Sequence, residues 1–175
     1  NKNLPMDPTR QLSFTTTEGT WISVDVSPDG QHIVFDLMGD IYRMPFSGGK
    51  AERLTKGMAY DVHPTYAPDG SKILFVSDRT GSDNAYVLEL ESMEVTQMTQ
   101  ESTESMVNGD WSPAGELFVV AKGRRNFKLH VMHEDGGQGT TVVDEPSNLK
   151  AIDPEFSADG QKIYYSRRTS GWNYN

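Results

Sequence analysis

The hydrophobic and polar residues of this chain alternate in short runs, and the same order of runs returns four times. Each repeat contains a stretch of β-branched and aromatic residues that follows a turn rich in Pro, Asp and Gly. Stretches of this kind are typical of strands, and no segment has the 3.6-residue period of an amphipathic helix. The four stretches lie at 33–35, 73–76, 117–120 and 163–165.

The turns before these stretches are copies of one tetrapeptide. Ser-Pro-Asp-Gly at 27–30 returns as Ala-Pro-Asp-Gly at 67–70, Ser-Pro-Ala-Gly at 112–115 and Ser-Ala-Asp-Gly at 157–160, with closing glycines 40, 45 and 45 residues apart. Pro presets φ for a turn, Asp caps it and Gly accepts a positive φ, so each copy is predicted to join two strands of a hairpin. The residues assigned this structural role are Pro28, Asp29, Gly30, Pro68, Asp69, Gly70, Pro113, Gly115, Asp159 and Gly160.

A third strand and a more polar fourth strand complete the repeat, for example at 85–90 and 95–99. A period of about 40–45 residues with four antiparallel strands per repeat is typical of β-propeller blades. The sequence therefore predicts an all-β protein with the β-propeller fold, built from four-stranded antiparallel blades. The large residues before three of the turns, Tyr66, Trp111 and Phe156, are expected to pack one blade against the next.

The repeats divide the chain into about three and a half blades. Residues 1–9 are assigned to an N-terminal arm, and 10–20 are expected to form a strand that closes the ring by completing the last blade. Because propellers close with about four to eight blades, we expect the chain to be a fragment of a longer protein. Its open strand edges are expected to pair with the remainder of its own propeller or with a second copy of the fragment. The blades are assigned to 21–57, 58–100 and 101–144, and an incomplete blade to 145–175.

Composition narrows the classes of partner. The formal net charge is −9 and the sequence pI is about 4.8, which argues against nucleic acid, because phosphate binding needs clustered Lys and Arg. The basic pairs at 124–125 and 167–168 are interpreted as solvated loops. No apolar run approaches the roughly 20 residues of a membrane helix, so no membrane span is predicted. The absence of Cys excludes thiol catalysis and Cys-zinc sites.

The common catalytic patterns are missing. The chain contains neither Gly-x-Ser-x-Gly nor His-Glu-x-x-His, and the Ser-Gly-Gly-Lys at 47–50 lies between two predicted strands, where a hairpin turn is expected. His130 and His133 are three residues apart, and an odd offset on a strand directs them to opposite faces. We therefore predict no catalytic, cofactor-binding or metal-ligating residue in this chain, and no enzyme activity of the chain alone.

One set of polar residues recurs two positions before each turn motif. The set would lie on the innermost strand of each blade, facing the central channel, on the opposite face from the large packing residues. One interpretation is a cation or polar-ligand site at the channel mouth, with oxygen ligands that suit Ca²⁺ and with Asp61 and Asp153 nearby. The other is that these groups bond neighbouring backbone amides and hydroxyls, and the sequence favours this second interpretation. The residues are Asp25, Thr65, Asp110 and Glu155.

The repeats resemble the Pro-Asp propeller repeat of the TolB type. The second copy, at 61–81, matches this pattern best, whereas the third has Ala114 in place of Asp and the fourth has Ala158 in place of Pro. In addition, the stretches 17–21, 36–42 and 45–49 look like the start of exported bacterial amidohydrolases, which carry such a propeller in front of a metal-dependent barrel.

The resemblance implies a periplasmic or secreted protein with a six- or seven-bladed ring. It implies that this chain is the non-catalytic N-terminal propeller region of a larger hydrolase, most simply an amidohydrolase, that serves as scaffold, substrate gate or docking surface. Zn²⁺ or another divalent metal would then belong to a downstream catalytic domain. The alternative is a TolB-like periplasmic propeller that binds a protein partner and has no enzyme activity.

Overall fold

The computed structural model describes residues 13–144 and 150–168, and these residues form fourteen strands and no helix. None of them therefore forms a helix that could span a membrane. The arm assigned to 1–9 and the start of the expected ring-closing strand lie outside the described residues. Residues 13–20 are described and form no strand.

Three of the sheets have four antiparallel strands each, which follow one another in chain order. Each sheet therefore has the topology of a propeller blade, and the predicted fold class is confirmed. The first blade contains β1 (Val24–Val26), β2 (His32–Leu37), β3 (Asp40–Pro45) and β4 (Glu52–Arg53). The second contains β5 (Asp61–Tyr66), β6 (Lys72–Ser77), β7 (Asn84–Glu89) and β8 (Val95–Gln97). The third contains β9 (Ser105–Trp111), β10 (Leu117–Gly123), β11 (Phe127–His133) and β12 (Thr140–Val143).

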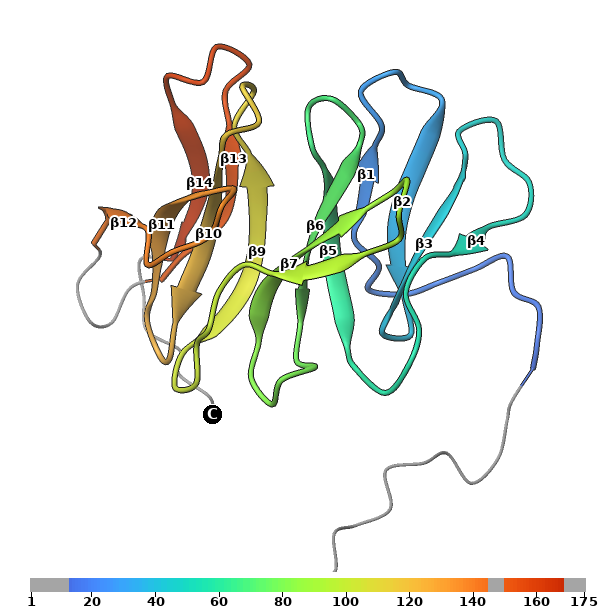
Figure 1. Ribbon diagram of the computed structural model, residues 1–175, viewed down its shortest axis with the longest axis horizontal. Coiled ribbons are helices and arrows are strands. Elements are labelled where there is room, and N and C mark those ends of the chain that lie inside the picture. The colour runs from blue at the N-terminus through green and yellow to red at the C-terminus, as the bar shows by residue number, and fades with distance from the viewer. Residues whose placement is uncertain (1–12, 145–149, 169–175) are drawn as a thin grey trace, which may run out of the picture.

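A fourth sheet pairs β13 (Lys150–Phe156) with β14 (Ile163–Arg168). The described residues thus form a partial propeller of about three and a half blades. The sheets stand face to face in succession, with the turns of the four motif copies along the upper edge of the view and the turns between second and third strands along the lower edge (Figure 1).

The motif turns are held by the hydrogen bonds that their composition predicts. In the first copy, the Ser27 hydroxyl donates to Asp29 Oδ1 over 2.6 Å, and Gly30 has a φ of 68°. The fourth copy repeats this arrangement with Ser157 and Asp159, also over 2.6 Å. The hydrogen bond from the serine hydroxyl is the main reason why the pKa of each of these aspartates lies below its usual value.

The turns also touch from blade to blade. The Cδ atom of Pro28 would lie 3.5 Å from a Cβ placed on Gly70, and that of Pro113 lies equally close to the corresponding point on Gly160. The proline of one turn therefore packs over the glycine of the next, and these two residues contribute to the contact between neighbouring blades as well as to their own turns.

The hydrophobic core lies between the blades. Tyr66 is buried with Val34 and Ile41 of the first blade, and Trp111 is buried with Leu74 and Val76 of the second. Phe156 packs against a cluster on the third blade that includes Val119, Ala121 and Leu129. The predicted role of the three aromatic residues as blade-to-blade packing is thereby confirmed.

Close approach of two strands requires a glycine in the third blade. A Cβ on Gly109 would lie 2.6 Å from the Val119 carbonyl oxygen and 3.3 Å from Leu74 Cδ2 of the neighbouring blade. Backbone atoms cannot yield as a flexible side chain can, so β9 would have to move away from both β10 and the second blade.

We expect Gly109→Ala to lower the free energy of unfolding by about 1–3 kcal/mol, because the added methyl group overpacks this junction. Urea denaturation measures the effect. Thr103→Ala, at an exposed position just before β9, is the matched control and should stay within about 0.5 kcal/mol. Equal stability of Gly109→Ala and the parent chain would contradict this account of the junction.

Candidate functional site

The predicted polar set lies at equivalent positions of the inner strands. Asp25, Thr65 and Asp110 pair with Val34, Leu74 and Val119, respectively, in the same register in three successive blades. Glu155 pairs with Tyr164 in the fourth sheet. The repeat therefore brings this set to one level of the fold, as its spacing predicts.

Three members of the set reach the backbone of the next blade. Asp25 Oδ2 accepts a hydrogen bond from the Tyr66 amide over 2.7 Å, and Asp110 Oδ2 accepts one from the Phe156 amide over the same distance. Between them, the Thr65 hydroxyl donates to the Gly109 carbonyl over 3.0 Å. The side chain of Glu155 is exposed and makes no hydrogen bond to a described residue.

These contacts are the ones that the second interpretation of the set requires, since the polar groups bond neighbouring backbone. Among residues 13–144 and 150–168, no three His, Asp or Glu side chains come together as a possible metal-binding group. Asp25 and Asp110 are thus the carboxylates of the set that link one blade to the next.

Burial raises the pKa of one of these carboxylates, that of Asp110. Desolvation raises the pKa of Asp110 to about 6, although the amides of Phe156 and Trp111 both donate to it, and the nearby charges of Asp25 and Glu155 raise it further. In the folded protein the protonated form is therefore favoured more than in the unfolded chain, where the carboxyl ionises near its usual value.

A second polar level lies two residues earlier on the same strands. Ser23 Oγ lies 2.8 Å from His63 Nδ1, which joins the first blade to the second. At the equivalent position of the third and fourth blades, Asn108 Nδ2 donates to Asp153 Oδ1 over 2.8 Å. Because the same position is bridged in both places, we interpret the serine–histidine pair as a link between blades.

The backbone of this second level is bulged. His63 and Asp153 have positive φ values of 55° and 53°, and the pairing of β5 and of β13 shifts register at these residues. Both residues precede a proline, which has no amide to donate to the ladder and which restricts the residue before it. The X-Pro pairs at 63–64 and 153–154 were the sequence signal for this level, which the turn repeat alone did not reveal.

Asp36 on β2 binds the backbone of two residues of the second level. Its carboxylate is buried, with Oδ1 accepting from the Ser23 amide over 3.1 Å and Oδ2 from the His63 amide over 2.9 Å. Burial lowers the pKa of His63, while the charges of Asp36 and Asp153 oppose that effect. One side chain therefore holds a segment from each of two blades.

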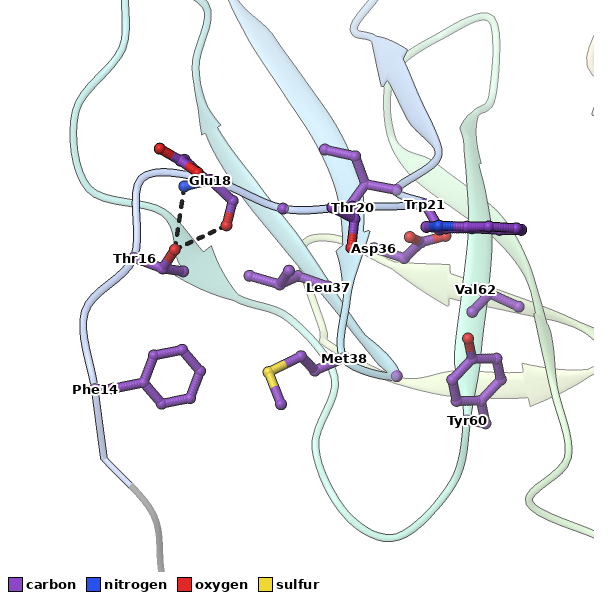
Figure 2. Close-up of a pocket in the computed structure, with 13 residues that line it drawn as sticks. Phe14, Thr16, Glu18, Thr20, Trp21, Asp36, Leu37, Met38, Tyr60 and Val62 are labelled. Atoms are coloured by element: carbon purple, nitrogen blue, oxygen red, sulfur yellow. Dashed lines mark hydrogen bonds between the residues drawn. The ribbon is translucent and has the colours of Figure 1, made fainter.

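A hollow of about 330 Å³ opens beside Asp36 at the start of the first two blades. Its walls carry exposed apolar side chains: Trp21 is fully exposed, and Phe14, Met38 and Tyr60 are more than half exposed. In Figure 2, Trp21, Val62 and Tyr60 form a column on one side, and Phe14 and Met38 lie on the other. We call this cavity, with the exposed side chains of Phe14, Trp21, Met38 and Tyr60 in its lining, the aromatic hollow.

The other residues singled out in the sequence lie elsewhere. His130 is on β11, where its Nδ1 lies 3.3 Å from the Thr141 hydroxyl, and His133 is exposed beside Asp135. The Ser-Gly-Gly-Lys segment forms the exposed turn between β3 and β4, as predicted. None of these residues contacts the aromatic hollow.

Comparison with known proteins identifies the repeat. The family model described as the TolB beta propeller domain matches residues 6–173. A Tricorn protease homolog 1 of Streptomyces coelicolor is 28% identical over 121 residues, which are 66% of this chain and 11% of that protein. A TolB homolog of Chlorobium luteolum is 28% identical over 142 residues, which are 78% of this chain and 31% of that protein.

Solved structures share the fold. The crystal structure of TolB from Acinetobacter baumannii superposes with a TM-score of 0.65 over 90% of this chain and 45% of that chain, at 21% sequence identity. The chain thus spans less than half the length of each of these three proteins.

Asp36→Ala should lower the free energy of unfolding by about 2–4 kcal/mol, because the amides of Ser23 and His63 both lose their acceptor. Urea denaturation tests this, with Glu91→Ala in the exposed β7–β8 turn as the control for removal of a carboxylate. A loss no larger than that of the control would show that Asp36 does not hold the two blades together.

Asp110 should make the protein less stable as pH rises through its folded pKa. Its folded pKa of about 6 lies above the unfolded value, so its favourable contribution is complete below about pH 4 and is lost by about pH 6. We expect the parent chain to lose stability relative to Asp110→Asn over this range in urea denaturation. Asp29→Asn is the control of opposite sign, because the folded pKa of Asp29 is lowered. A carboxyl ¹³C titration of Asp110 with its midpoint below about 4 would contradict the assignment.

Proposed function

The chain belongs to the TolB β-propeller domain family, and from that premise we propose that it is a protein-interaction propeller of the periplasm or another exported compartment. The observation that carries the proposal is the aromatic hollow. Aromatic and methionine side chains are enriched in protein interfaces, and exposed apolar groups gathered around one cavity are typical of binding surfaces.

The chain uses strained backbone to present this surface. Trp21 has a φ of 61°, and Met38 has a φ of 56° in the two-residue turn that it forms with Gly39 between β2 and β3. Positive φ is uncommon for bulky residues and costs about 1–3 kcal/mol where the surrounding structure imposes it. The two-residue hairpin turn itself requires the positive φ of Met38, so the strain at Trp21 is what supports a role of this surface in binding.

The hollow is also held in place before any partner arrives. Ser23, two residues after Trp21, is tied to Asp36 and to His63, and the Tyr60 amide donates to Asp78 Oδ1 over 2.8 Å. A surface that is already ordered loses less conformational entropy on binding, which favours affinity.

A second candidate is the propeller region of a larger hydrolase, in which this surface would dock or gate a catalytic domain. The similarity to part of a Tricorn protease homolog supports a hydrolase context. The amidohydrolase form of this proposal rests on the resemblance of 17–21, 36–42 and 45–49. A His-x-His pair encoded after residue 175 in the same gene would favour an amidohydrolase, and a Gly-x-Ser-x-Gly would favour a serine hydrolase.

We test the interaction proposal by selecting peptides from a random display library on the purified chain. Trp21→Ala should weaken the selected peptides by more than about tenfold, since tryptophan is a frequent hot-spot residue. Phe46→Ala is the matched control, because Phe46 is 63% exposed in the β3–β4 turn and lies outside the hollow. Peptides that bind Trp21→Ala and the parent chain equally would refute the hollow as the docking surface.

A further inference from the structure

Basic side chains gather at one end of the third blade, although the chain as a whole has a net charge of −9. Lys122 is the last residue but one of β10, Arg124 and Arg125 lie in the turn, and Lys128 follows on β11. The β10–β11 turn lies along the same lower edge of the view as the β2–β3 turn that carries Met38 (Figure 1). This end of the blade therefore faces the same side of the propeller as the aromatic hollow.

These residues surround a hollow of their own. A cavity of about 290 Å³ is lined by Lys122, Arg124, Asn126, Lys128, His130 and Thr141, with Glu104 at one side. The neighbouring Arg125 does not line this cavity. The arrangement combines positive charge with two neutral hydrogen-bonding side chains, Asn126 and Thr141.

The charges around the cavity differ in how firmly they are paired. Lys122 Nζ is largely buried and lies 2.6 Å from Glu101 Oε1 and 3.4 Å from Glu104 Oε2, so its charge is already balanced inside the protein. Lys128 pairs with Asp144 over 2.5 Å, but Asp144 is 70% exposed, and such solvated pairs contribute little and exchange readily.

Arg124 is the remaining cation of the cavity. It is exposed, and no carboxylate of residues 13–144 or 150–168 lies within ion-pair distance of it. His130 adds no charge at neutral pH, because burial and the nearby Lys122 lower its pKa. Arg124 and Lys128 line the same cavity, and an anionic group that contacts both would have to displace only the exposed Asp144 from Lys128.

We propose that this cavity is a binding site for a single carboxylate. An arginine presents a planar fork of donors that matches a carboxylate, and Lys128, Asn126 and Thr141 supply further polar contacts. A polyanion is disfavoured, because Glu104 lines the cavity, Asp144 pairs with Lys128 of its lining, and the whole protein is acidic. The source of the carboxylate follows from the proposed interaction function, on which this part of the proposal rests. The carboxylate belongs to the protein partner, as an acidic side chain or as its C-terminus.

The test is an amide NMR titration of the ¹⁵N-labelled chain at about 20 mM salt, where screening is weak. The probes are N-acetylglutamate amide for an acidic side chain, N-acetylglycine for a chain terminus, N-acetylglutamine amide as the uncharged analogue, and inorganic phosphate. We expect at least one carboxylate probe to shift the amides of 122–130 and of Thr141, with a dissociation constant of about 1–10 mM. Which probe binds more tightly identifies the source of the group.

Two substitutions in the same turn distinguish binding at a specific site from a general effect of removing positive charge. Arg124→Gln should weaken the carboxylate probe by more than about fivefold, whereas Arg125→Gln, which removes the same charge outside the cavity, should change it by less than about twofold. Equal loss in both variants, equal binding of the uncharged analogue, tighter binding of phosphate, or no shift at all would each overturn the proposal. Trp21→Ala should leave the titration unchanged, so failure of the interaction surface and failure of the carboxylate site are distinguishable.

Discussion

The structure depends on hydrogen bonds that cross from the inner strand of one blade to the backbone of the next. A blade cannot bond its neighbour edge to edge as strands of one sheet do, because the sheets stand face to face (Figure 1). Instead, Asp25 and Asp110 accept hydrogen bonds from backbone amides of the following blade, and the Thr65 hydroxyl donates one to a backbone carbonyl. Apolar packing around Tyr66 and Trp111 fills the rest of these interfaces.

The same links explain why one end of the first two blades can carry a surface of exposed apolar side chains. Asp36 holds Ser23 and His63 through their amides; Ser23 lies two residues after Trp21, and His63 directly follows Val62. A buried carboxylate that accepts two backbone amides is well satisfied and rigid, so the neighbouring segments can afford positive φ values at Trp21 and Met38. Structural polar groups and the candidate docking surface are therefore parts of one arrangement.

The third blade shows how the repeat tolerates variation and acquires new chemistry. Where the second and fourth blades have a proline in the inner strand, the third has Gly109, whose missing side chain lets β9 approach β10 and the second blade. At the other end of this blade, the β10–β11 turn carries arginines beside a cavity. In the sequence these arginines had no feature that separated them from a solvated loop, because the cavity depends on Thr141 and His130 from other strands.

By itself, the sequence determined the all-β fold, the four motif turns, the order of strands within each blade and the level of Asp25, Thr65, Asp110 and Glu155, because all of these follow from local turn chemistry and a repeat of about 40–45 residues. Only the tertiary structure decided which atoms these side chains bond, since their partners lie 41 to 46 residues away on another sheet. It also decided the clamp of Asp36, which has no counterpart in the other repeats, and the gathering of Phe14, Trp21, Met38 and Tyr60 around one hollow. Contacts between blades depend on how the sheets stack. A repeat in the sequence specifies the strands of each blade directly, but it does not specify which residues of neighbouring blades come into contact.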